Sequence, residues 1–136
     1  MAASFVTIQK LRFCDTDRLG HVNNAVYAVL YEAGRVDLFQ SLGLLSGPLG
    51  VVIARLEIDF LREMDWPGEV RVETSVARIG TKSLHMRQHL LLAGAVVSCG
   101  RSVLATIDPV TRRAVPIGED WRAALAPWQV ADNPTS

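Results

Sequence analysis

The sequence lacks an excess of charge of either sign. Its 14 lysines and arginines balance 14 aspartates and glutamates, so the formal net charge is +0. Proteins that attract nucleic acid or an anionic membrane through a global field carry a basic excess. We therefore expect neither of these partners, although a local cluster of basic side chains could still hold a polyanionic ligand.

Cysteines and long apolar runs are also scarce. Cys14 and Cys99 do not make a disulfide framework and no signal-like segment precedes them, so we expect reduced thiols and a cytoplasmic location. The longest uncharged apolar run, Leu90 to Val97, is far shorter than the roughly 20 residues of a membrane span. His85 and His89 have no further ligands near them in sequence, so no metal site is expected.

One domain is expected from the length and composition. The chain has 136 residues, of which 49% are hydrophobic and 21% charged, as in soluble globular proteins. We expect the domain to span residues 1–136, with a loose tail over 127–136.

A helix is predicted over residues 24–42. Asn23 and Asn24 precede a strongly apolar stretch that ends at Gly43. Asparagine favours helix N-termini, and glycine is a common stop. Apolar residues cover most of the circumference of this helix, which predicts that it is buried and enclosed by other elements.

Alternating apolar residues predict strands on both sides of this helix. The clearest case is 52–60, where Val52, Ala54, Leu56, Ile58 and Phe60 are expected to share one face. Further strands are predicted at 5–13, from 70 to 76, at 84–92 and at 95–107, and a short helix at 119–125. The last four strands follow one another through short turns. This order predicts an α+β fold with an antiparallel sheet of about five strands.

Polar side chains that could perform chemistry concentrate at 15–24, between the first strand and the helix. The N-terminus of a helix presents unpaired N–H groups that can polarise a carbonyl. Asp17 lies seven residues before Asn24, close enough to fold back over that point. A carboxylate and an oxyanion-binding site together are the minimum for acyl transfer.

Other interpretations of Asp15 and Asp17 are weaker. A calcium loop needs a carboxylate at the twelfth position, where this chain has Val26. A phosphatase of the Asp-x-Asp type needs alternating strands and helices, which are missing. Carboxylates that only cap the loop or the helix remain an alternative.

The segment resembles the signature of the 4-hydroxybenzoyl-CoA thioesterase-like family. The matching residues are Asp15-Thr16-Asp17-x-x-Gly20-His21-Val22-Asn23-Asn24-x-x-Tyr27, followed by Glu32 and Arg35. The resemblance extends from the first strand to Asp108 and implies the hotdog fold, in which an antiparallel sheet wraps one long helix. It also implies an acyl-CoA thioesterase without a cofactor, because coenzyme A is part of the substrate.

Carried over onto this sequence, the family's catalytic aspartate falls on Asp17. The N–H that polarises the carbonyl falls at or next to Asn24, where many relatives have a histidine; here the motif has His21 instead. Asp17 could be nucleophile or general base, and His21 an active-site hydrogen-bonding residue or one that stabilises the turn. Further candidates for substrate binding are Asn23, Tyr27, Lys82 and Ser83, the last two at a turn where relatives contact coenzyme A.

Simpler roles are expected for several neighbours of the motif. Glu32 and Arg35, three apart on a helix, are expected to form an ion pair. Tyr27 and Tyr31 are expected to pack with a tethered hydroxyl. Cys14 has no base at a suitable distance in the sequence, so it is not expected to be a nucleophile.

The resemblance also implies a partner. Subunits of the family join edge to edge and share active sites, so we expect a homodimer or a dimer of dimers. Two alternatives for function stay open: a non-catalytic acyl-CoA-binding protein and a thioesterase that acts on acyl carrier protein. A hotdog hydratase is disfavoured, because its Asp and His, five positions apart across a proline, have no counterpart at Asp17 and Val22.

Overall fold

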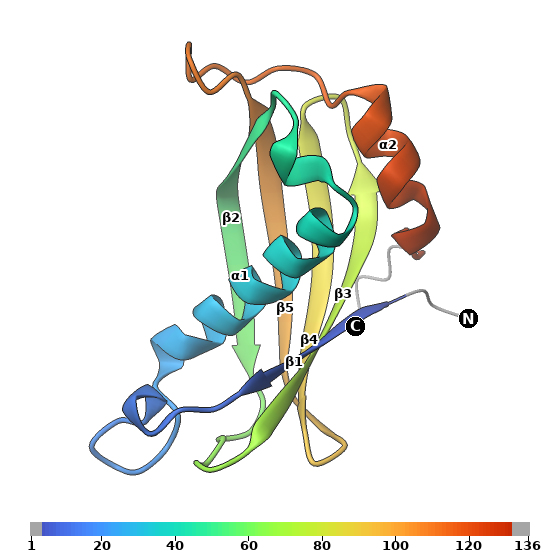
Figure 1. Cartoon of the computed structure of the whole chain (residues 1–136). Helices are drawn as coiled ribbons and strands as arrows, with labels where there is room; N and C mark the ends of the chain where they lie inside the picture. Colours follow the sequence, from blue (N-terminus) through green and yellow to red (C-terminus); the bar gives the residue numbers. More distant parts are fainter. Residues whose placement is uncertain (1–3, 132–136) are drawn as a thin grey trace.

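A five-stranded sheet with a long helix across one face forms the body of the molecule (Figure 1). The computed structural model describes residues 4–131. In chain order its elements are β1 (Phe5–Lys10), a 3-10 turn (Phe13–Asp15), α1 (Asn24–Ser41), a 3-10 turn (Leu44–Ser46), β2 (Gly50–Phe60), β3 (Glu69–Ile79), β4 (Ser83–Leu92), β5 (Ala95–Ile107), α2 (Glu119–Leu125) and a 3-10 turn (Ala126–Trp128). No helix within residues 4–131 is long and apolar enough to cross a membrane.

The sheet has the strand order β1-β3-β4-β5-β2, and every neighbouring pair is antiparallel. This confirms the predicted antiparallel sheet of five strands. The expected run of four hairpin-linked strands is wrong at its first link, because β2 pairs with β5 and not with β3. The connection 61–68 takes the chain from the β2 edge past the end of β5, where the N–H groups of Leu61 and Arg62 both donate to the Val97 carbonyl.

Strand β2 does not alternate regularly. Ile53 lies opposite Leu104 of β5 and Arg55 lies opposite Val103, so Ala54 is an extra residue in a β-bulge. A bulge exchanges the two faces of a strand from that point on. The prediction that Val52 shares a face with Leu56 is therefore wrong.

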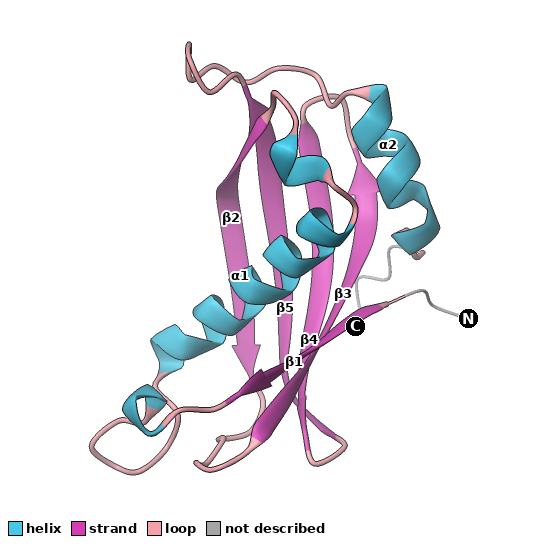
Figure 2. Ribbon diagram, viewed as in Figure 1, coloured by secondary structure: helices cyan, strands magenta, loops and turns pink. Residues whose placement is uncertain are grey.

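Helix α1 lies at the predicted position, across one face of the sheet (Figure 2). Tyr27, Tyr31 and Leu38 are at most 2% exposed and pack against the sheet. Gly34 marks the closest approach, because a Cβ there would lie 2.6 Å from Cγ1 of Val72. The helix can rest on the sheet at this distance only without a side chain at position 34.

The opposite side of α1 is open. Val29 is 56% exposed and Val36 is 40% exposed, so the prediction of a helix enclosed on all sides is wrong for a single chain. The expected ion pair between Glu32 and Arg35 is also wrong. Arg35 is buried under the helix, where its Nη1 donates to Oε1 of Gln88 at 3.3 Å, and burial lowers the pKa of its guanidinium.

The two ends of the chain differ from their predictions. Strand β1 ends at Lys10, three residues before the predicted boundary, and the next segment turns. Residues 127–131 are not loose: Trp128 packs edge-on against Phe5 at 5.6 Å, and the N–H of Val130 donates to the Val76 carbonyl at 2.8 Å. The rest of the predicted tail, 132–136, lies outside the described residues.

Candidate active site

The loop between β1 and α1 is a small closed hairpin. Thr16 and Val22 form an isolated antiparallel bridge. Within it, the N–H of Asp17 donates to the carbonyl of His21 at 2.7 Å, and the N–H of Gly20 donates to the carbonyl of Asp17 at 3.1 Å. Gly20 has φ of +85°, a backbone conformation that other residues adopt only at a cost. The loop therefore holds Asp17 in a defined place.

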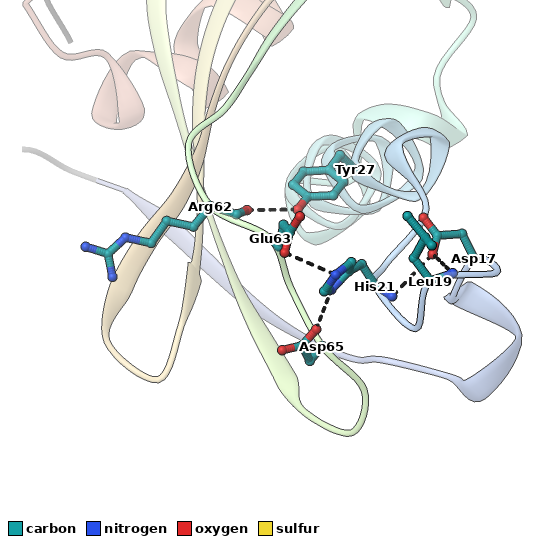
Figure 3. A network of polar contacts seen from close by, with 7 residues as sticks. All are labelled: Asp17, Leu19, His21, Tyr27, Arg62, Glu63 and Asp65. Atoms are coloured by element: carbon teal, nitrogen blue, oxygen red, sulfur yellow. Dashed lines mark hydrogen bonds and ion pairs between the residues drawn. The ribbon is translucent and has the colours of Figure 1, made fainter.

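The Asp17 carboxylate is exposed and oriented by its own loop (Figure 3). Its Oδ1 accepts hydrogen bonds from the backbone N–H groups of Leu19 at 2.9 Å and His21 at 3.3 Å. Within residues 4–131 no hydrogen bond involves Oδ2. One oxygen thus fixes the side chain, and the other is available to a reactant.

Asp15, the other carboxylate of the motif, has a structural environment. It is 5% exposed, and its side chain accepts bonds from the backbone N–H of Arg12 at 2.7 Å and from the Arg12 guanidinium at 2.8 Å. Burial alone raises the pKa of Asp15, but the bonds from Arg12 outweigh it and hold the pKa below its usual value. The backbone carbonyl of Asp15 also accepts a hydrogen bond from the N–H of Asn23 at 2.8 Å. Asp15 thus anchors the start of the helix.

The first turn of α1 exposes one backbone amide. Asn23 is the N-cap, and its Oδ1 accepts from the N–H of Ala25 at 2.9 Å. The N–H of Val26 donates to the Asn23 carbonyl at 2.9 Å. The N–H of Asn24 has no acceptor within residues 4–131, as expected for the first residue of a helix. This N–H can bind an oxyanion at the positive end of the helix dipole.

Asp17 and Asn24 line the same cleft, which has a volume of about 240 Å³. The other lining residues are Leu19, His21, Val22, Tyr27, Phe60, Leu61, Arg62 and Glu63. They come from the loop, from α1 and from the end of β2 with the connection that follows it. Leu19, Phe60 and Leu61 are 81%, 50% and 55% exposed, so the cleft is open and its rim is apolar.

Tyr27 forms one wall of the cleft. Its ring packs edge-on against Phe60 at 4.8 Å, and its hydroxyl donates to the Arg62 carbonyl at 3.1 Å. The hydroxyl of Tyr31 likewise donates to Oγ of Ser98 at 2.6 Å. The prediction of tethered hydroxyls is confirmed for both tyrosines.

His21 makes contacts that sequence reasoning missed. Its Nδ1 lies 2.7 Å from Oδ1 of Asp65 and its Nε2 lies 3.2 Å from Oε2 of Glu63. Both acids belong to the connection between β2 and β3 and lie more than 40 positions away in sequence. No spacing or periodicity links them to the motif, so only the tertiary structure reveals the cluster.

Ser83 begins β4 and Lys82 precedes it, and the turn between β3 and β4 is at the end of the sheet opposite to the loop between β1 and α1 (Figure 1). Ser83 is opposite Ala105, and Ala105 is opposite Val52 of β2. The cleft lies near Phe60, eight positions further along β2, which corresponds to roughly 26 Å. A single chain therefore does not bring Lys82 and Ser83 to Asp17.

Other candidate groups contribute no second site. Cys14 and Cys99 are free thiols. Within residues 4–131, no group of three or more His, Cys, Asp or Glu side chains is arranged to hold a metal ion.

Comparison with known proteins identifies the family of this chain. The model of the thioesterase-like superfamily matches residues 11–125. The uncharacterized protein YsmA of Bacillus subtilis is 28% identical over 127 residues, which cover 90% of this chain and 85% of YsmA.

Two solved structures at 32% identity extend the match. A predicted thioesterase from Bacillus stearothermophilus superposes with a TM-score of 0.86, covering 96% of this chain and 100% of that one. A thioesterase from Thermus thermophilus, solved with coenzyme A and Zn, has a TM-score of 0.79 and covers 88% of this chain and 95% of that one. The chain belongs to the thioesterase-like superfamily and is a thioester hydrolase.

Proposed function

We propose that this protein hydrolyses acyl-coenzyme A thioesters with Asp17 as the catalytic carboxylate. The observation that supports the proposal is that Asp17 and Asn24 line one cleft and that, within residues 4–131, neither Oδ2 of Asp17 nor the N–H of Asn24 has a hydrogen-bond partner. A thioester carbonyl placed between them has a negatively charged oxygen near its carbon and an N–H donor near its oxygen. These are the two groups that acyl transfer requires.

The reaction joins a water oxygen to the acyl carbon and breaks the carbon–sulfur bond. The sulfur leaves with one of the two water protons as the thiol of coenzyme A, the acyl group leaves as a carboxylate, and the second proton is released to solvent. Asp17 attacks the carbon directly, giving an anhydride that water opens, or it takes a proton from the attacking water. In both routes negative charge develops on the carbonyl oxygen, and the Asn24 amide at the helix N-terminus stabilises it.

The substrate carrier is proposed as coenzyme A. The relative from Thermus thermophilus was solved with coenzyme A bound. Acyl carrier protein is an acidic partner and needs a broad basic docking surface, and the net charge of +0 provides no overall excess of basic residues for it.

A homodimer is proposed because one chain leaves an edge and a helix face open. Strand β2 is at the edge of the sheet, where unpaired backbone groups invite another strand. Its Ile53 and Phe60 are 46% and 50% exposed, and Val29 and Val36 are exposed on α1. A second copy that pairs through β2 covers these apolar side chains.

Charges on β2 select the register of this pairing. Arg55 and Glu57 lie on one face of the strand and form an ion pair. An antiparallel pair of identical strands centred on Leu56 places Arg55 opposite the partner's Glu57 on both sides of the dyad. If the dyad of the strand pair lay at Arg55, Glu57 or Ile58 instead, like charges would lie opposite each other, which is unfavourable.

This register also gives Lys82 and Ser83 access to the cleft of the other subunit. It brings the Val52 end of one β2 level with the Phe60 end of the other. Ser83 lies on β4, two strands inward from Val52 on β2. The partner's β2 is one strand spacing beyond β2, so Ser83 is three strand spacings, or about 14 Å, from it. Lys82 and Ser83 are therefore proposed to contact substrate bound at the partner's Asp17.

A hydrolysis screen tests the proposed activity. Aliphatic, branched and aromatic acyl-CoAs are incubated with the protein, and the released thiol is measured. We expect at least one class to be hydrolysed with kcat/KM of about 10⁴ M⁻¹s⁻¹ or more, as for typical enzymes. Binding of several acyl-CoAs without thiol release would instead identify a non-catalytic binding protein. Thiol release from acyl carrier protein thioesters alone would show that the substrate is carried by acyl carrier protein and not by coenzyme A.

A further inference from the structure

The ring of His21 is held between two carboxylates (Figure 3). Nδ1 lies 2.7 Å from Asp65 and Nε2 lies 3.2 Å from Glu63. An ionised carboxylate can only accept a hydrogen bond, so both ring nitrogens must donate, which only the protonated imidazolium can do. Since both nitrogens are occupied, neither is directed at a substrate.

The ring contacts reinforce a junction between two segments of backbone. His21 and Asp65 form an isolated antiparallel bridge, and the N–H of Val22 donates to the Met64 carbonyl at 2.8 Å. Met64 is itself completely buried. The loop that carries Asp17 is thus attached to the connection between β2 and β3 at this point.

The same residue holds the catalytic carboxylate. The His21 N–H donates to Oδ1 of Asp17 at 3.3 Å, and the His21 carbonyl accepts the N–H of Asp17 at 2.7 Å. Across the cleft from Asp17 lie Leu61 and Glu63 of the connection. A shift of His21 relative to the connection therefore moves Asp17 relative to the far wall of the cleft.

We propose that His21 is a positioning residue, which as an imidazolium ties the Asp17 loop to Glu63 and Asp65 and so fixes the Asp17 carboxylate relative to the Asn24 amide. This inference rests on the proposed function. It assigns an indirect role to the histidine of the motif, and it adds two acidic residues to the machinery of the site.

A pH dependence follows from the charges around the ring. Glu63 and Asp65 face it from the connection, and Asp17 faces it from its own loop. The hydrogen bond to Asp65 is the main cause that raises the pKa of His21; burial opposes it, and the charges of the three acids add to it. The cation is therefore present at low pH and is lost as the pH rises through this raised pKa. Activity should decline on the alkaline side, with a midpoint above the usual value of about 6.5.

Stability should depend little on this cluster. The side chains of Glu63 and Asp65 are 73% and 72% exposed, and ion pairs this exposed contribute little to the free energy of unfolding. A role in positioning thus predicts a loss of kcat without a matching loss of Tm, which separates it from a purely structural role.

The experiment compares pH profiles of kcat and KM for three variants of the cluster and one control variant. His21→Gln should lower kcat about tenfold, because small displacements of catalytic groups are costly, with KM nearly unchanged and without the decline of kcat on the alkaline side. His21→Arg keeps a cation that can face both acids and should recover part of kcat. The double variant Glu63→Gln/Asp65→Asn should move the alkaline midpoint to lower pH. Glu119→Gln/Asp120→Asn changes the net charge equally, at the far end of the molecule, and should leave the profile unchanged.

Two outcomes overturn the inference. One is wild-type kcat and pH profile in His21→Gln. The other, which applies even if His21→Gln fails to fold, is an unmoved alkaline midpoint in the Glu63→Gln/Asp65→Asn variant. If Asp17→Asn is inactive in the same assays, the proposed function survives either result; if Asp17→Asn is fully active, the proposed function itself fails.

Discussion

Asp17→Asn is expected to lower kcat for the best acyl-CoA substrate by about 10³-fold, the usual contribution of a positioned acid, base or nucleophile. Asparagine keeps the Oδ1 atom that accepts from Leu19 and His21, so the loop should retain its shape. Substrate binding and Tm should change little, because the side chain is exposed. Rates in single-turnover assays and binding of a slowly hydrolysed acyl-CoA separate these effects.

The matched control is Asp108→Asn. Asp108 caps its own loop in the same manner, since its Oδ1 accepts from the N–H groups of Val110 at 2.8 Å and Thr111 at 3.0 Å. This loop follows β5 and lies at the end of the sheet opposite to the cleft of its own chain (Figure 1), the end that the proposed dimer brings toward the partner's cleft. Asp108 has no proposed role in the chemistry, so Asp108→Asn is expected to keep most of the wild-type kcat. Equal rates for Asp17→Asn and the wild type would show that Asp17 is not the catalytic carboxylate.

Leu56→Arg is expected to have the second-largest effect, through the subunit interface. In the proposed register the two copies of residue 56 meet at the dyad, so the variant places two unpaired cations against each other at a covered edge. Burying an unpaired charge costs several kcal/mol, which weakens dimerisation roughly 100-fold or more. Activity should fall with it, since each cleft loses the partner's Lys82 and Ser83. Light scattering and kcat/KM are measured together over a range of protein concentrations.

Cross-linking tests the register itself. In a Cys14→Ser/Cys99→Ser background, Leu56→Cys should form a disulfide-linked dimer on oxidation, because residues directly opposite in antiparallel strands are about 4.5–5.5 Å apart at Cα. Val110→Cys is the control; Val110 is 88% exposed on a distant loop and should cross-link poorly. A wild-type protein that is monomeric at micromolar concentration, with full activity, would contradict the dimer.

Local patterns predicted the elements well. The apolar stretch between Asn23 and Gly43 located α1 because capping residues act within one turn of the helix end. Alternation located β3, β4 and β5, and short turns between them implied their antiparallel pairing. The motif likewise placed Asp17 beside the start of the helix, because only a short hairpin separates them.

These local patterns could not predict contacts between segments that are far apart in the sequence. The pairing of β2 with β5 depends on the path of residues 61–68, and the bulge at Ala54 is invisible in an alternation that looks regular. The cluster of His21 with Glu63 and Asp65 depends on contacts between segments that are more than 40 positions apart in the sequence. The exposed apolar face of α1 was visible in the sequence, but it was assigned to intramolecular burial, whereas we now propose that a second subunit covers it.

A crystal structure of the Asp17→Asn variant with a bound acyl-CoA tests the central geometry most directly. We expect the thioester oxygen to lie about 2.7–3.1 Å from the backbone nitrogen of Asn24. We also expect the side chain at position 17 to lie about 3–3.5 Å from the carbonyl carbon or from a water that contacts it. A thioester bound away from this helix end, or with its oxygen turned from the Asn24 amide, would contradict it.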